Sequence, residues 1–156
     1  MIIAKKTRSF RILALLLAIV LSVPFYAHAT SENSPTPYAS RYLTSYNSYV
    51  YNAAWGKVQA YFDVTGVGYM DEIGLLSIQL YESTDNENWT WVKTYNHSTT
   101  SGMLASDKIY HSGYVEYAGT IGRYYKAYVC IWAGKDGDGD SRYMWTNTVK
   151  ATLLPG

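Results

Sequence analysis

The sequence contains little of what usually cross-links, anchors or charges a small protein. Cys130 is the single cysteine among 156 residues, so no disulfide can form within the chain. The three histidines have no cysteine beside them and make a weak case for a zinc site. After residue 11 there is no run of basic side chains, which argues against nucleic acid as a partner. Packing therefore has to hold the fold together.

The first 29 residues have the order of features of a cleavable signal peptide. An apolar run over residues 12–23 follows four basic side chains and ends at Pro24. This run is shorter than the roughly 20 residues that span a bilayer, and the small-x-small sequence Ala27-His28-Ala29 follows it. We therefore predict that residues 1–29 are removed and that the protein is secreted. No later apolar run is long enough to hold it in a membrane after cleavage.

Cleavage would change the charge of the chain. Four of the 13 basic residues precede position 30 whereas all 12 acidic residues follow it, so the net charge falls from +1 to −3. Residues 30–37 are polar and interrupted by proline, which predicts a flexible leader. Residues 38–156 then form a single domain that is long enough to bury a core. A domain of this size without disulfides fits a bacterial secreted protein.

Short alternating segments separated by turn residues indicate an all-β fold. The clearest is residues 57–65, where Val58, Phe62 and Val64 alternate with polar side chains. Gly66-Val67-Gly68 is expected to end this strand, and residues 134–140 to form a hairpin loop. The other predicted strands cover residues 45–51, 75–83, 89–95, 109–117, 124–133 and 142–152. About seven such strands without a helical period predict an antiparallel β-sandwich.

Residues 124–133 form the predicted central strand. Alternation divides them into an inward set and an outward set. The inward set is Tyr125, Ala127, Val129, Ile131 and Ala133, and the outward set is Tyr124, Lys126, Tyr128, Cys130 and Trp132. A tyrosine that enters the penultimate strand of an immunoglobulin-like or fibronectin type III-like sandwich often bonds back to the preceding corner. Tyr125 follows the tight corner at residues 119–122, so we predict that it has this structural role.

Several short motifs occur together along the chain. They are Y-E-S-T-D and W-x-x-V-K-T-Y in residues 81–95, H-S-G-x-V at 111–115, G-R-Y-Y-K-A at 122–127, A-G-K-D-G at 133–137, D-S-R at 140–142 and T-N-T-V at 146–149. With these motifs the chain resembles a family of small secreted proteins from Gram-positive, clostridia-like bacteria, a domain of unknown function. The hairpin at residues 81–92 is similar to that between the third and fourth strands of fibronectin type III domains. The resemblance implies a secreted single domain and brings no catalytic residue, ligand or partner.

Aromatic residues are the strongest remaining signal. Residues 30–156 contain 16 tyrosines and five tryptophans, which is more than a core of this size needs. Several occupy positions that we expect to face outward: Tyr81, Tyr128, Trp132, Tyr143 and Trp145. If the hairpin, central and last strands share a sheet, these rings lie on one face. They then either bind a ligand or pair across strands, each pair contributing on the order of 0.5–1 kcal/mol to the sheet.

Alternating carboxylates at Asp136, Asp138 and Asp140 suit a hard cation such as Ca²⁺. Against the EF-hand pattern, however, Ser141 stands where a glycine is needed and Asn147 where a bidentate glutamate is needed. The segment also joins predicted strands instead of helices. A solvated Gly/Asp hairpin turn is the alternative, and we expect weak Ca²⁺ binding or none.

No constellation of residues points to catalysis. Asp71, Glu72 and Glu82 could supply paired carboxylates, but glycoside hydrolysis needs them about 5–10 Å apart across a cleft. Cys130 is expected to be a small packed side chain among aromatic rings. We therefore expect a monomeric, non-catalytic protein that binds a glycan or a cell-surface polymer and needs no cofactor. A small secreted toxin or bacteriocin-like effector and a calcium-dependent adhesive module are the alternatives.

Overall fold

The computed structural model describes residues 40–155, and the predicted signal peptide (residues 1–29) and leader (residues 30–37) lie outside that part. The described chain forms strands only, and it contains no helix that could cross a membrane. The strands are β1 (Leu43–Asn52), β2 (Lys57–Met70), β3 (Glu72–Ser83), β4 (Thr90–Asn96), β5 (Leu104–Ala105), β6 (Lys108–Ala118), β7 (Tyr124–Lys135), β8 (Asp138–Trp145) and β9 (Val149–Lys150). Seven of them overlap the seven predicted strands, and β5 and β9 have two residues each.

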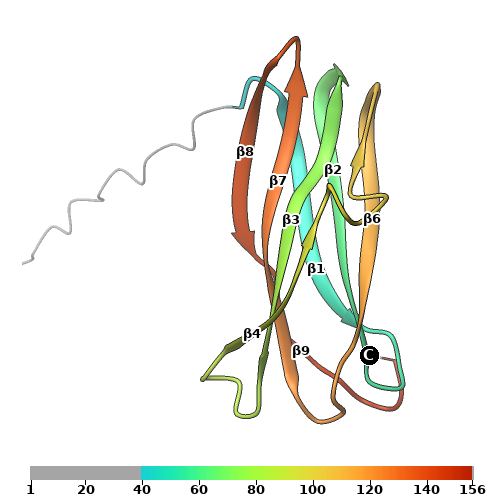
Figure 1. Ribbon diagram of the computed structural model, residues 1–156, viewed down its shortest axis with the longest axis vertical. Coiled ribbons are helices and arrows are strands. Elements are labelled where there is room, and N and C mark those ends of the chain that lie inside the picture. Colours follow the sequence, from blue (N-terminus) through green and yellow to red (C-terminus); the bar gives the residue numbers. More distant parts are fainter. Residues whose placement is uncertain (1–39, 156) are drawn as a thin grey trace, which may run out of the picture. The chain divides into compact units, whose positions relative to one another are not determined.

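Two antiparallel sheets form a β-sandwich, which confirms the predicted fold class. One sheet has three strands in the order β1-β2-β6. The other has six: four long strands in the order β4-β3-β7-β8, with the short β5 paired to β3 and β9 to β7. We call it the four-stranded sheet after its four long strands. The long strands of both sheets run along the long axis of the domain (Figure 1). The hairpin β3–β4, the central strand β7 and the last long strand β8 therefore share one sheet, the arrangement expected from the fibronectin-like order.

The core lies between the two sheets and follows the alternation of the sequence. All five residues of the inward set of β7, from Tyr125 to Ala133, are completely buried. Val58, Ala60, Phe62 and Val64 of β2 face them from the other sheet and are also buried. Tyr125 is the largest fully buried side chain and packs against Tyr117, with ring centroids 5.9 Å apart.

The strand β2 does not end at Gly66-Val67-Gly68, so that expectation was wrong. It continues to Met70, and its pairing with β6 shifts between Thr65 and Met70. The backbone stays extended because the Val67 N–H donates to the Tyr42 carbonyl at 3.0 Å. A Cβ at Gly66 would lie 2.7 Å from Cγ of Met70, so only glycine at this position leaves room for the Met70 side chain. Here glycine accommodates a bulge instead of breaking the strand.

The loop expected at residues 134–140 is also shorter than predicted. β7 continues to Lys135 and β8 begins at Asp138, which leaves Asp136 and Gly137 as a two-residue turn. Both residues have positive φ, at 55° and 79°. This is the type I′ geometry that asparagine or aspartate followed by glycine favours between twisted strands. The sequence carried this signal at Asp136-Gly137, but the glycines around it suggested a longer loop.

The segment after β8 joins the two sheets at the edge of β1. The Asn147 side chain accepts a hydrogen bond from the Val50 N–H at 2.8 Å and donates to the Val50 carbonyl at 3.0 Å. Further along, the Trp55 N–H donates to the Leu153 carbonyl, also at 3.0 Å. The side chain of Asn147 therefore satisfies the backbone of an edge strand as a neighbouring strand would.

Candidate functional site

The outer face of the four-stranded sheet carries a group of four rings, Tyr81, Tyr128, Tyr143 and Trp145, which we call the aromatic cluster. Strand register brings them together. Tyr128 of β7 pairs with Trp145 of β8, and Tyr143 pairs with the neighbouring outward position, Cys130. Tyr81 of β3 pairs with Lys126 on the other side of β7. Four of the five rings predicted from the sequence thus lie on one surface.

The rings of the aromatic cluster touch in a continuous chain. The Trp145 centroid lies 4.9 Å from that of Tyr128 and 5.2 Å from that of Tyr81, and Tyr128 lies 5.9 Å from Tyr143. Tyr143 is 61% exposed and Trp145 is 48% exposed. Cys130 is buried beside them, and its side-chain hydrogen bond with Tyr143 is the main cause of a raised pKa of that phenol. The cluster is thus both a packed unit and an open surface.

Lys126 lies within this surface. Its Nζ is 4.2 Å from the Trp89 ring centroid and 4.5 Å from that of Trp145, so the ammonium group sits over two indoles. Such contacts contribute about 0.5–1 kcal/mol each when exposed. They hold Lys126 and Trp145 in a defined arrangement and place a positive charge beside the aromatic cluster.

Trp132 lies apart from the aromatic cluster. Within residues 40–155 it makes no ring contact, and it packs instead on the β7–β8 hairpin. A Cβ at Gly139 would lie 2.3 Å from Cη2 of the indole, and one at Gly134 would lie 2.8 Å from Cζ2. The Trp132 indole N–H is buried without a partner among the described residues. The ring borders a hollow of about 410 Å³ that includes Asp71, Glu72 and Asp138.

Two of the three carboxylates of the proposed Ca²⁺ segment, Asp138 and Asp140, have other partners, and Asp136 is held through its backbone. Asp138 accepts a hydrogen bond from the Tyr42 hydroxyl at 2.8 Å, which is the main cause of its lowered pKa. Asp140 forms an ion pair with Arg142. The Asp136 N–H donates to Asp71 at 2.7 Å. No group of three or more metal-ligating side chains comes together within the described part of the chain.

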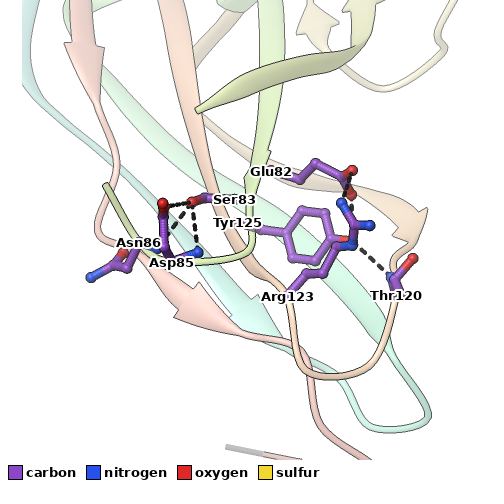
Figure 2. A network of polar contacts seen from close by, with 7 residues as sticks. All are labelled: Glu82, Ser83, Asp85, Asn86, Thr120, Arg123 and Tyr125. Carbon is purple, nitrogen blue, oxygen red and sulfur yellow. Dashed lines mark hydrogen bonds and ion pairs between the residues drawn. The ribbon is translucent and has the colours of Figure 1, made fainter. Parts of the chain in front are cut away.

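Tyr125 occupies the corner predicted from the sequence, and Figure 2 shows the polar contacts around it. Its hydroxyl accepts a hydrogen bond from the Thr120 N–H at 2.7 Å and donates to Glu82 at 3.0 Å. Glu82 also forms an ion pair with Arg123 at 2.7 Å. Burial is the main cause of a raised pKa of the Tyr125 phenol. Glu82, a candidate for paired-carboxylate chemistry, is thus part of a structural network.

Three further tyrosines form a row that was not predicted from the sequence. Tyr49 of β1, Tyr61 of β2 and Tyr114 of β6 are directly opposite one another on the outer face of the three-stranded sheet. Their centroids are 5.3 Å apart between Tyr49 and Tyr61 and 5.0 Å apart between Tyr61 and Tyr114. Alternation along residues 57–65 places Tyr61 on the face opposite to Val58, Phe62 and Val64, but sequence alone could not give the register that aligns three strands.

The comparisons with known proteins identify neither a family nor a function. The chain matches no protein-family model and none of the curated proteins. Among solved structures it is similar to Spo0M, a sporulation control protein from Bacillus subtilis, with a TM-score of 0.39 and 11% sequence identity. The similarity covers 70% of this chain and 49% of the Spo0M chain, so this chain spans about half of that protein. A likeness at this level carries no functional argument.

Proposed function

We propose that the protein is a secreted, non-catalytic β-sandwich that binds a glycan or a cell-surface polymer through the aromatic cluster. The observation that carries this proposal is the open chain of rings on the four-stranded sheet. A contiguous exposed aromatic surface on a soluble domain usually marks a contact site. Sugar rings present C–H faces that pack on aromatic rings, while phenol and indole groups remain available for hydroxyls.

The charge beside the rings favours a polymer that carries some negative charge. Lys126 is held over Trp89 and Trp145, at 4.2 Å and 4.5 Å, so its position is set before a ligand arrives. A preorganised side chain loses less conformational freedom when it binds. An acidic glycan or cell-wall polymer would meet both this ammonium group and the rings. The absence of catalysis is proposed because two of the three candidate carboxylates already have structural partners: Glu82 is paired with Arg123, and Asp71 accepts a hydrogen bond from the Asp136 N–H.

Replacement of the most connected ring tests the binding surface. In Trp145→Ala we expect loss of retention on insoluble polysaccharides or isolated cell walls, with a cost in stability of about 1–2 kcal/mol from lost ring contacts. Trp55→Ala is the matched control because Trp55 is 78% exposed in the β1–β2 turn, away from the cluster. It should bind as the parent protein does.

Binding and a thermal melt should be measured on the same samples. If Trp145→Ala is too unstable to assay, Tyr143→Ala removes a more exposed ring of the same cluster. Unchanged retention in both folded variants would mean that the rings only stabilise the sheet. Secretion is tested separately by intact-mass spectrometry of the culture supernatant, where a species that retains residues 1–29 would contradict the proposed export.

A further inference from the structure

A groove crosses the outer face of the three-stranded sheet, on the side of the sandwich opposite to the aromatic cluster. It has a volume of about 420 Å³. The row of Tyr49, Tyr61 and Tyr114 borders one side, and Tyr110 borders the other. Tyr110 and Tyr114 are four residues apart on β6, so their Cα atoms are separated by roughly 13 Å along the strand. That gap is wide enough for a small ligand group between aromatic walls.

The floor of the groove carries an unpaired negative charge. Asp63 of β2 and Ser112 of β6 are directly opposite each other between the aromatic walls. The Asp63 side chain is half-buried and makes no hydrogen bond or ion pair within residues 40–155. On the same sheet face, Glu116 is bonded to Lys57 at 2.8 Å and to Gln59 at 2.9 Å. A carboxylate that has no partner among these residues and lies between aromatic walls provides a preference for a cation.

The two aromatic surfaces of the protein differ in one respect. On the four-stranded sheet, Lys126 of the chain itself lies over the rings. On the three-stranded sheet, no lysine of the described residues lies over Tyr49, Tyr61, Tyr110 or Tyr114. The groove thus has aromatic walls and a carboxylate that would attract a cation, but no lysine of the described residues supplies that cation.

We propose that this groove binds an alkylammonium group of an external ligand, with Asp63 as the counter-charge and the tyrosines as its aromatic walls. Aromatic rings attract ammonium cations through their quadrupoles, and quaternary ammonium groups are recognised in this way by cages of rings. The site is separate from the aromatic cluster in both position and ligand chemistry. Binding at this groove does not depend on glycan binding by the four-stranded sheet.

Choline and n-butylammonium are suitable probes, since they carry a quaternary and a primary ammonium group. The control ligand is the neutral isostere of choline, in which a carbon atom replaces the nitrogen. Titration of the mature protein, followed by amide chemical shifts, should locate changes at Asp63, Ser112 and Tyr114. We expect a cation to bind at least about tenfold more tightly than the neutral isostere. The tighter of the two cations identifies the kind of ammonium group that the groove prefers.

Two variants test the role of the carboxylate. Asp63→Asn keeps the shape of the side chain and should weaken cation binding by about tenfold or more. Glu116→Gln removes an acid of the same face that is already paired, and should leave binding within about twofold. Trp145→Ala should also leave it unchanged, which separates the two surfaces. If Asp63→Asn is poorly folded, Tyr110→Ala, which removes an exposed wall, should weaken cation binding in its place.

Four results would overturn the proposal. Three of them are binding of the neutral isostere as tight as that of the tighter cation, unchanged cation binding in a folded Asp63→Asn variant, and the absence of any shift change in the groove with an excess of choline and with an excess of n-butylammonium. Shift changes that appear only around Trp145 would place the ammonium site on the other sheet and would equally refute it.

Discussion

Removal of the Tyr125 hydroxyl should lower the free energy of unfolding, although it deletes only one oxygen atom. The hydroxyl is bonded to the Thr120 N–H at 2.7 Å and to Glu82 at 3.0 Å. Tyr125→Phe keeps the ring and its contact with Tyr117 but leaves the Thr120 donor without this partner. Glu82 keeps its ion pair with Arg123 and loses a donor. The variant therefore isolates the two hydrogen bonds of the corner.

The expected loss of unfolding free energy is about 1–2 kcal/mol. A typical intramolecular hydrogen bond contributes about 0.5–1.5 kcal/mol, and a buried group left without a partner costs about 1–3 kcal/mol. The estimate lies toward the lower part of these ranges because Glu82 retains Arg123 and the loop at Thr120 can relax toward water. With a urea slope of about 1.5–2 kcal/mol/M, the midpoint should fall by about 0.5–1.3 M.

Tyr124→Phe is the matched control for this measurement. Tyr124 is the neighbouring residue on β7, and its ring contacts Lys150 but its hydroxyl makes no described hydrogen bond. Its removal should leave the midpoint nearly unchanged. An unchanged midpoint and slope in Tyr125→Phe would show that the corner bonds contribute nothing to stability. An equal fall in both variants would assign the loss to something other than those bonds.

Three further predictions concern other parts of the chain. Gly139→Ala should destabilise the protein by about 1–3 kcal/mol because the new Cβ would meet the Trp132 ring, whereas Gly68→Ala, in open space, should be nearly neutral in the same denaturant titration. Hydrogen bonds from Asn88, and then from Glu87 and Ser83, hold the pKa of Asp85 far below its ordinary value of 3.8. The ionised Asp85 carboxylate therefore stabilises the fold above pH 3.8, and this stabilisation is lost as the pH falls from 3.8 through the lowered pKa of the folded state. Melts between neutral and acidic pH should show a smaller acid loss in Asp85→Asn, and no such change in Glu87→Gln. Calorimetric titration with Ca²⁺ should give no dissociation constant below about 10 μM, since Asp138 and Asp140 have other partners, and tighter binding would contradict the described geometry.

The strands could be predicted because their burial alternates. On β7, every second residue from Tyr125 is buried, and the sequence pattern identified all five. Alternation is less reliable on β3, where counting back in steps of two from the buried Ile78 and Leu80 would place Leu76 inward as well. The pairing of β3 with β7 shifts between Leu75 and Ser77, and Leu75 takes the buried position instead. A bulge changes the face of a side chain without leaving a clear mark in the sequence.

The candidate surfaces depended on register, which the sequence specified only in part. Tyr128, Tyr143 and Trp145 came together because a two-residue turn at Asp136-Gly137 aligned β7 with β8. Trp132 was on the expected face, but the glycines at 134 and 139 let its ring fold onto the hairpin. The position of the ring depends on the absence of a side chain at Gly134 of β7 and at Gly139 of the partner strand β8, which the period of the sequence does not reveal.

The hydrogen bonds between Asn147 and Val50 also determine when, during synthesis, the edge of β1 can be covered. They join residues 97 positions apart, so the edge of β1 is synthesised long before its partner. At about 5–20 residues per second, that edge stays open for roughly 5–20 s on the ribosome. β1 contains no charged residue that would discourage pairing with a strand of another chain. In a growing or truncated chain that lacks Asn147, the tyrosine-rich edge of β1 has no partner for its backbone. We therefore expect aggregation of such chains to begin at β1.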